Sequence, residues 1–328
     1  MSHKVITLFF LLVCGLQAAL AQELPHSSES ALSWLKKMTD APRKHNYSGT
    51  FVYYADSHME TSRIIHKTDQ TGEHEKIEVL DGTPRIVFRN NDEMKCYVPG
   101  SKEIYIEKSW FRKFFPNLFP HSLDDIDSNY YVKEVKLERV IDHECQVLSL
   151  IPRDSLRYGH QFWIDKETGI LLKVAVTGGN EVIEQFAFVQ LEIDGEINSD
   201  LLKPEHSIVF KDEWKVTDLV ASISKEDELK WQVRNLPAGF KKLAEMRRNL
   251  VGKPKLVNHI ALSDGLATVS IFIEPVIKDA PAPVSGFFSG RGAINIYVRL
   301  LDDNKITTIG EVPLETIKLI SDSVFRQD

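Results

Sequence analysis

Apolar and polar residues alternate along most of the first two hundred positions. Short runs rich in aromatic and β-branched side chains are separated by turn residues, such as Asp81-Gly82-Thr83-Pro84. This pattern predicts a meandering antiparallel sheet. The expected strands are 47–54, 62–67, 76–80, 85–89, 93–98, 103–108, 130–137, 145–151, 160–164, 171–176 and 184–191.

Residues 29–44 follow a different period. Ala31, Leu35 and Met38 recur at helical spacing, and Asp40-Ala41-Pro42 ends the run. One helix and about ten strands favour a strongly curved sheet or open barrel wrapped around the helix.

The regular pattern is lost over residues 203–228, which contain a proline and a run of charges. Beyond it, shorter strands are expected at 229–233, 255–262, 267–273, 293–299 and 306–309, and a helix follows Pro313. A chain of 328 residues exceeds one typical hydrophobic core. The sequence therefore predicts a barrel-like domain over 22–210, a linker over 211–228 and a smaller α+β domain over 229–328.

The first residues resemble a secretory leader. Lys4 precedes the apolar run 5–13, and Ala19-Leu20-Ala21 offers small residues for signal peptidase. We expect residues 1–21 to be a signal peptide and the mature chain to be exported. Cys14 follows the bulky Val13, which argues against lipidation there.

Charge narrows the classes of partner. The chain has 40 basic and 47 acidic residues, a formal net charge of −7, which argues against nucleic-acid binding. Residues 229–328 are nevertheless net positive, with 14 basic and 10 acidic residues. This asymmetry fits two domains with different partners, and an ordinary solvated surface is the alternative.

Two cysteines, Cys96 and Cys145, remain after the expected leader is removed. In an oxidising compartment they suggest one disulfide, and the loop it closes would make it worth roughly 3–4 kcal/mol. Two buried thiols are the alternative. Their spacing forms no CxxC motif, so a redox enzyme is not indicated.

Catalytic motifs are missing from the sequence. It contains no GxSxG, HExxH, P-loop or GxGxxG pattern. His66 and His74 are expected on neighbouring strands, but surface histidines are a better interpretation than a metal site, which needs three or four converging ligands. We therefore predict no catalytic residue, no metal and no cofactor.

An aromatic segment interrupts the strands at residues 110–119. Such a segment either caps the open end of the barrel or contacts a lipidic ligand, and both interpretations stay open. The candidate ligand-binding residues are Trp110, Phe111, Phe114, Phe115 and Phe119.

A basic stretch lies in the second domain at residues 241–255, with Glu245 as its one acidic residue. It suggests a contact surface for an anionic partner, and a solvated face is the alternative. The candidate residues are Lys241, Lys242, Arg247, Arg248, Lys253 and Lys255.

Motifs in both predicted domains resemble the RseB/MucB family of periplasmic negative regulators of an extracytoplasmic-stress sigma factor. The resemblance covers nearly the whole mature chain in the right order, although no single motif is decisive. The matching segments are 47–53 (YSGTFVY), 72–75, 80–85, 89–93, 236–240 (LPAGF), 263–267 (SDGLA) and 310–313 (GEVP).

The resemblance implies a large domain similar to the lipoprotein carriers LolA and LolB, an unclosed antiparallel barrel with helices over its opening. It implies a non-enzymatic protein of the periplasm. The expected partner is the periplasmic segment of a membrane-spanning anti-sigma factor, which the protein would shield from the site-1 protease. Lipopolysaccharide or lipoprotein acyl chains are the expected lipidic signals. A periplasmic lipid or lipoprotein carrier is the alternative, and homo-oligomerisation stays open.

Overall fold

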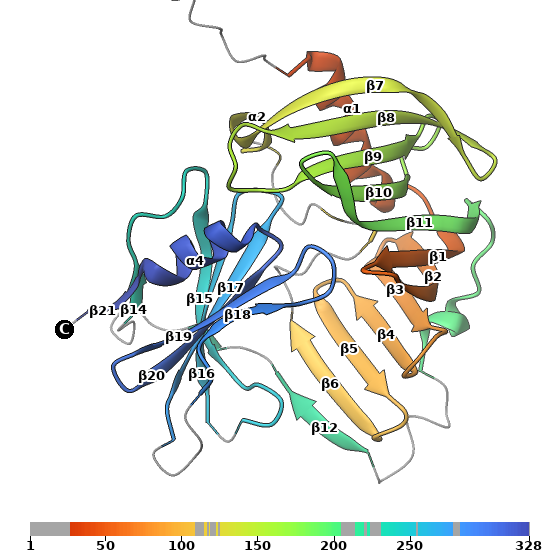
Figure 1. The fold of residues 1–328 in the computed structure, drawn as a ribbon. Coiled ribbons are helices and arrows are strands. Elements are labelled where there is room, and N and C mark those ends of the chain that lie inside the picture. The colour runs from red at the N-terminus through yellow and green to blue at the C-terminus, as the bar shows by residue number, and fades with distance from the viewer. Residues whose placement is uncertain are drawn as a thin grey trace, which may run out of the picture.

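The computed structural model describes residues 27–108, 115–116, 118, 123, 125–204, 214–219, 222–223, 231–253, 255–277 and 283–327. The expected signal peptide, 1–21, lies outside these residues. The described chain forms a twelve-stranded sheet, a seven-stranded sheet and one additional strand pair (Figure 1). None of its described helices is both long and apolar enough to cross a membrane.

The large sheet holds the expected meander. Its strands are β1 (Tyr47–Ala55), β2 (His58–Asp69), β3 (Gly72–Val79), β4 (Arg85–Asn90), β5 (Glu93–Val98), β6 (Glu103–Lys108), β7 (Tyr130–Val140), β8 (His143–Pro152), β9 (Gly159–Asp165), β10 (Leu171–Gly178), β11 (Glu181–Ile193) and β12 (Lys215–Asp218).

The order of these strands is β12-β6-β5-β4-β3-β2-β1-β11-β10-β9-β8-β7, so β1 pairs with β11 and joins two consecutive meanders. Strands β7 and β12 stand at opposite edges, and the sheet is not closed. This confirms the expected unclosed barrel. All pairs are antiparallel except that of β12 with β6, which is parallel and was not expected.

Helix α1 (Glu29–Asp40) lies against the large sheet and crosses behind β8 to β10 in Figure 1. Its N-cap Ser28 accepts a hydrogen bond from Ala31 N at 3.0 Å, which satisfies one of the free amides of the first turn. Ala31, Leu35 and Met38 are buried, as the helical spacing predicted. A short 3-10 turn (Ala41–Arg43) ends the helix, α2 (Ile126–Asn129) precedes β7, and a second 3-10 turn (Ser199–Leu202) follows β11.

The smaller sheet has the order β13-β15-β16-β17-β20-β19-β18. The bounds are β13 (Ser222–Ile223), β15 (Lys241–Arg248), β16 (Val257–Ser263), β17 (Thr268–Pro275), β18 (Gly286–Ser289), β19 (Asn295–Leu301) and β20 (Asn304–Gly310). Helix α4 (Leu314–Asp322) buries Ile317 and Ile320 in the core of this sheet. Strands β14 (Trp231–Val233) and β21 (Val324–Arg326) form the separate pair.

The expected linker, 211–228, includes strands of both sheets. Strand β12 pairs with β6 in the large sheet, and β13 pairs with β15 in the small one. Leu219 N also donates to the carbonyl oxygen of Ile106 at 2.7 Å. The change from one sheet to the other therefore falls between residues 219 and 222.

Candidate functional site

A buried ion pair joins the two sheets. The Arg157 side chain is fully buried and donates from Nη1 to Asp264 Oδ2 at 3.0 Å. It also donates to Asp154 in its own loop and to the carbonyl oxygen of Ala238 in the second sheet's domain. Tyr130 Oη donates to the same Asp264 oxygen at 3.0 Å. Complete pairing of this kind is what makes a buried charge tolerable.

Asp264 is held in place by its own turn. Its Oδ1 accepts from Leu266 N at 2.9 Å and from Ala267 N at 2.6 Å, and Gly265 takes the left-handed backbone, with φ +101°, that the turn requires. From the sequence, residues 263–265 were expected only to lie between two strands, within a segment that resembles the family. The pair was missed because 107 residues separate Arg157 from Asp264, and no local pattern links them.

Two residues of the predicted basic stretch hold the domains together. Lys241 Nζ donates to Asp125 Oδ1 at 2.6 Å, and Arg248 Nη2 donates to Glu107 Oε1 at 2.6 Å. Arg248 is 6 % exposed, because its place on β15 directs the side chain toward the large sheet. Arg248 is thus a correction to the predicted surface: it forms a buried contact between domains and is not available to a partner.

The other basic residues stay on the surface. Lys242 donates to Glu245 within β15, and Lys253 Nζ lies 2.7 Å from Glu274 Oε2. Arg247 and Lys255 are exposed, and neither has an ion-pair partner among the residues that the structure describes. The unneutralised charge of the stretch is therefore concentrated at these two side chains.

A pocket of about 270 Å³ lies next to Lys253 and Lys255. Its wall is otherwise largely apolar, and the lining residues are Lys253, Lys255, Leu256, Val257, Glu274, Pro275, Val276 and Ile277. Burial raises the pKa of Glu274, but hydrogen bonds from Lys253 and Lys305 outweigh burial and leave this pKa below its usual value. The pocket combines exposed apolar surface, including Ile277, with two lysines at its rim.

Phe115 is the described member of the predicted aromatic segment. It is 5 % exposed, stacks on Phe186 at 5.6 Å between ring centroids, and contacts Phe51 and Phe188 at 5.2 and 5.1 Å. At this position the side chain fills the core of the large sheet, as the capping interpretation requires. Trp110, Phe111, Phe114 and Phe119 lie outside the described residues.

His66 corrects the interpretation of the histidines as surface groups. Its ring is fully buried and stacked on Tyr47. Nδ1 lies 2.9 Å from Glu75 Oε1 and Nε2 lies 2.6 Å from the carbonyl oxygen of Pro42. Each ring nitrogen of His66 therefore faces an oxygen that can accept a hydrogen bond.

The same network explains the titration of Glu75. Burial alone would raise the pKa of this carboxyl, but hydrogen bonds from His66 and Arg89 lower it to about 2. His74 lies apart from His66 and contacts Asp69 and Thr71. No group of three or more potential metal ligands converges within the described part of the chain.

The predicted disulfide is wrong for this structure. Cys96 lies on β5 and Cys145 on β8, with seven strands between them in the sheet order, so the two sulfur atoms are not bonded to each other. Alternation placed each residue on a strand but carried no information about the order of those strands. Burial raises the pKa of the Cys145 thiol to about 12, so this residue is a poor nucleophile.

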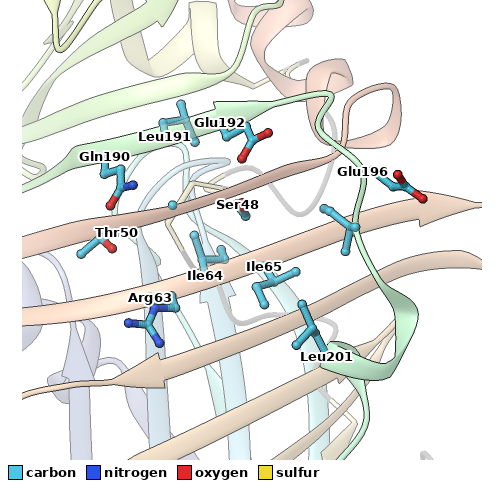
Figure 2. Close-up of a pocket in the computed structure, with 12 residues that line it drawn as sticks. Ser48, Thr50, Arg63, Ile64, Ile65, Gln190, Leu191, Glu192, Glu196 and Leu201 are labelled. Atoms are coloured by element: carbon cyan, nitrogen blue, oxygen red, sulfur yellow. The ribbon is translucent and has the colours of Figure 1, made fainter.

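Figure 2 shows a second pocket, of about 250 Å³, lined by residues of β1, β2 and β11 in the large sheet. The segment that follows β11, with Glu196 and Leu201, runs past β1 and β2 here. Glu192 and Glu196 lie toward one end and Arg63 toward the other, with aliphatic Ile65 nearby. No sequence motif indicated this pocket.

Comparison with known proteins matches both halves of the chain to one family. Residues 30–206 match the MucB/RseB N-terminal domain, and residues 225–325 match the MucB/RseB C-terminal domain. The sigma factor AlgU regulatory protein MucB of Pseudomonas aeruginosa is 28% identical over 329 residues, covering 97% of this chain and 96% of that protein. The sigma-E factor regulatory protein RseB of Escherichia coli K12 is 23% identical over 300 residues, covering 88% and 89%. A crystal structure of MucB in complex with MucA(peri) superimposes with a TM-score of 0.69 and 26% identity, covering 91% of this chain and 99% of that one.

Proposed function

This chain belongs to the MucB/RseB family, and from that premise we propose that it is a regulatory binding protein of the bacterial periplasm. The named relatives regulate sigma factors, and the family is not one of enzymes. The proposed location follows from the expected signal peptide and from the periplasmic part of MucA seen with MucB.

The proposed partner is the periplasmic segment of a membrane-spanning anti-sigma factor. The observation that carries this proposal is the likeness, over nine tenths of the chain and both sheets, to MucB solved with MucA(peri). Bound in this way, the protein shields the segment from the site-1 protease and holds the stress response off. A carrier that used only the large sheet would not need the second domain.

The pocket beside Lys253 and Lys255 is the surface that we propose for this partner. Its apolar wall suits hydrophobic side chains of an extended segment, and Lys255 suits an acidic one, whereas Lys253 is already paired with Glu274. Rim charges act mainly on the rate of association and are screened by salt. Arg247 is the other exposed basic residue of the stretch without an ion-pair partner among the described residues, whereas Lys241 and Arg248 serve the contact between domains.

The test compares two double variants, each of which removes two positive charges. Lys253→Gln with Lys255→Gln should slow association with the segment by about tenfold at low salt and flatten its salt dependence. Lys36→Gln with Lys203→Gln, two exposed lysines of the first domain, should leave association unchanged. Stopped-flow binding measures the rate of association. Site-1 protease digestion of the bound segment then measures how well it is shielded.

Equal association rates for the two double variants would remove this surface from the proposal. Cleavage of the bound segment at the rate of the free one would remove the shielding role.

Lipid sensing is the second part of the proposed function. The large sheet is open and its core is rich in aromatic residues, including Phe115, so a lipid acyl chain could replace these contacts. Lipopolysaccharide should then release a prebound segment in a dose-dependent way. Lipid binding by a protein that never binds the segment would favour the carrier alternative.

A further inference from the structure

The loop between β18 and β19 contacts the large sheet through two consecutive amides. Gly292 N donates to Asp56 Oδ2 at 2.8 Å, and Ala293 N donates to Glu184 Oε2 at 3.2 Å. The same Glu184 oxygen accepts from Tyr53 Oη at 3.0 Å. One carboxyl of β11 is therefore bonded both within its own sheet and to the second domain.

The fit at this contact is close. Gly292 has a φ of +61°, and a Cβ there would lie 2.1 Å from Glu184 Oε2 and 2.8 Å from Tyr53 Oη. Ala293 is fully buried, and Glu184 is 7 % exposed. Water therefore has little access to the carboxyl while the loop is docked, and docking depends on how well the protein itself accommodates that group.

The charges around Glu184 are mostly of its own sign. Asp56 lies on the turn after β1 and Glu311 follows β20, whereas Arg291 is the cation of the loop itself. The phenols of Tyr53 and Tyr158 complete the surroundings, and burial raises the pKa of each above its usual value. The carboxylates do not form a metal site among the described residues. A proton is the remaining means of relieving their repulsion.

We propose that this contact is a proton-controlled latch between the domains. The loop at residues 290–294 docks on β1 and β11 when Glu184 is protonated, and it is released when Glu184 loses its proton. The Arg157–Asp264 pair keeps the domains together in both states. The latch depends on no external partner and goes beyond the proposed function.

The sign and size of the effect follow from linkage. Burial and the nearby Glu311 raise the pKa of docked Glu184 from 4.5 to about 7, more than the hydrogen bonds from Ala293 and Tyr53 lower it. A released, solvated Glu184 returns to its ordinary pKa, so docking is favoured at low pH and weakens as the pH rises through 7. Between pH 5.5 and 8.5 the docking equilibrium should fall roughly 30-fold.

The experiment is an NMR titration of the mature protein without any partner. The amide signals of Gly292 and Ala293 should shift with a midpoint near pH 7, and their protection from exchange, corrected for the intrinsic rate, should fall roughly 30-fold from pH 5.5 to 8.5. Glu184→Gln keeps the size and the acceptor but cannot titrate, so both readouts should become independent of pH. Glu192→Gln on the same strand, outside the loop contact, should behave as wild type.

A wild-type titration with no inflection near pH 7 would overturn the latch, as would an inflection that survives in Glu184→Gln. If that variant does not fold, the side-chain carboxyl carbon of Glu184 reports its own titration in the wild-type protein, and an ordinary midpoint near 4.5 would refute the proposal. No partner is present, so neither result bears on the proposed function.

Discussion

Replacing Arg157 by methionine should strongly destabilise the protein. Methionine fills much of the same space but leaves the Asp264 carboxylate, which is fully buried, without its cation. Removing one partner of a buried ion pair typically costs about 3–5 kcal/mol, because the remaining charge is neither solvated nor paired. Tyr130 and two backbone amides still donate to Asp264, which places the expected loss toward the lower end of that range.

The assay is urea unfolding followed by tryptophan fluorescence and far-ultraviolet circular dichroism. Arg139→Met is the control, because the Arg139–Asp142 pair is highly exposed, at 71% and 84%, and should contribute less than about 1 kcal/mol. Adding Asp264→Asn to Arg157→Met removes the stranded charge and should recover part of the loss. A loss below about 1 kcal/mol in Arg157→Met, or no recovery in the double variant, would refute the reasoning.

Three further outcomes follow from other buried groups. The depressed pKa of Glu75 adds stability, on the order of 3 kcal/mol, that is fully present above about pH 4.5 and lost as the pH falls toward 2. Acid titration of the unfolding free energy of Glu75→Gln should lack this loss. The same acid profile in the variant and the wild type would contradict the prediction. Phe115→Ala should lower the unfolding free energy by about 3–5 kcal/mol in a denaturant melt. The control Phe287→Ala, at a side chain that is 48 % exposed, should lower it far less. Equal losses would argue against the packing described for Phe115. Cys145 should resist alkylation at pH 8 in the native protein and react at once after unfolding, so rapid native labelling detected by mass spectrometry would contradict its burial.

Local patterns predicted the elements of this fold better than their arrangement. Helix α1 was predicted from the spacing of Ala31, Leu35 and Met38, because residues three and four apart lie on the same face of a helix and that face is buried. Alternation and turn residues likewise located the strands of the first meander. Neither signal specifies which strands become neighbours, so the parallel β12 and the distance between the two cysteines could not be predicted.

In the candidate site, too, the sequence indicated the residues better than their arrangement in space. Charge clustering indicated residues 241–255 as a candidate surface, but it could not separate Lys255, which is exposed, from Arg248, which is buried against Glu107. That distinction depends on which face of β15 meets the other domain. Glu184 belonged to an ordinary alternating strand in the sequence, and its unusual surroundings arise only when a loop more than a hundred residues later docks on it.

The buried pairs between the sheets also restrict how this protein can be recombined. Arg157 and Glu107 come from one half of the chain, and their partners Asp264 and Arg248 come from the other. A second domain transplanted from a distant relative would have to supply an aspartate and an arginine at those two places. Otherwise Arg157 and Glu107 would be buried between the domains without partners. The two halves are therefore inherited most readily as a unit, and a substitution at one member of a pair creates selection for a compensating change at the other.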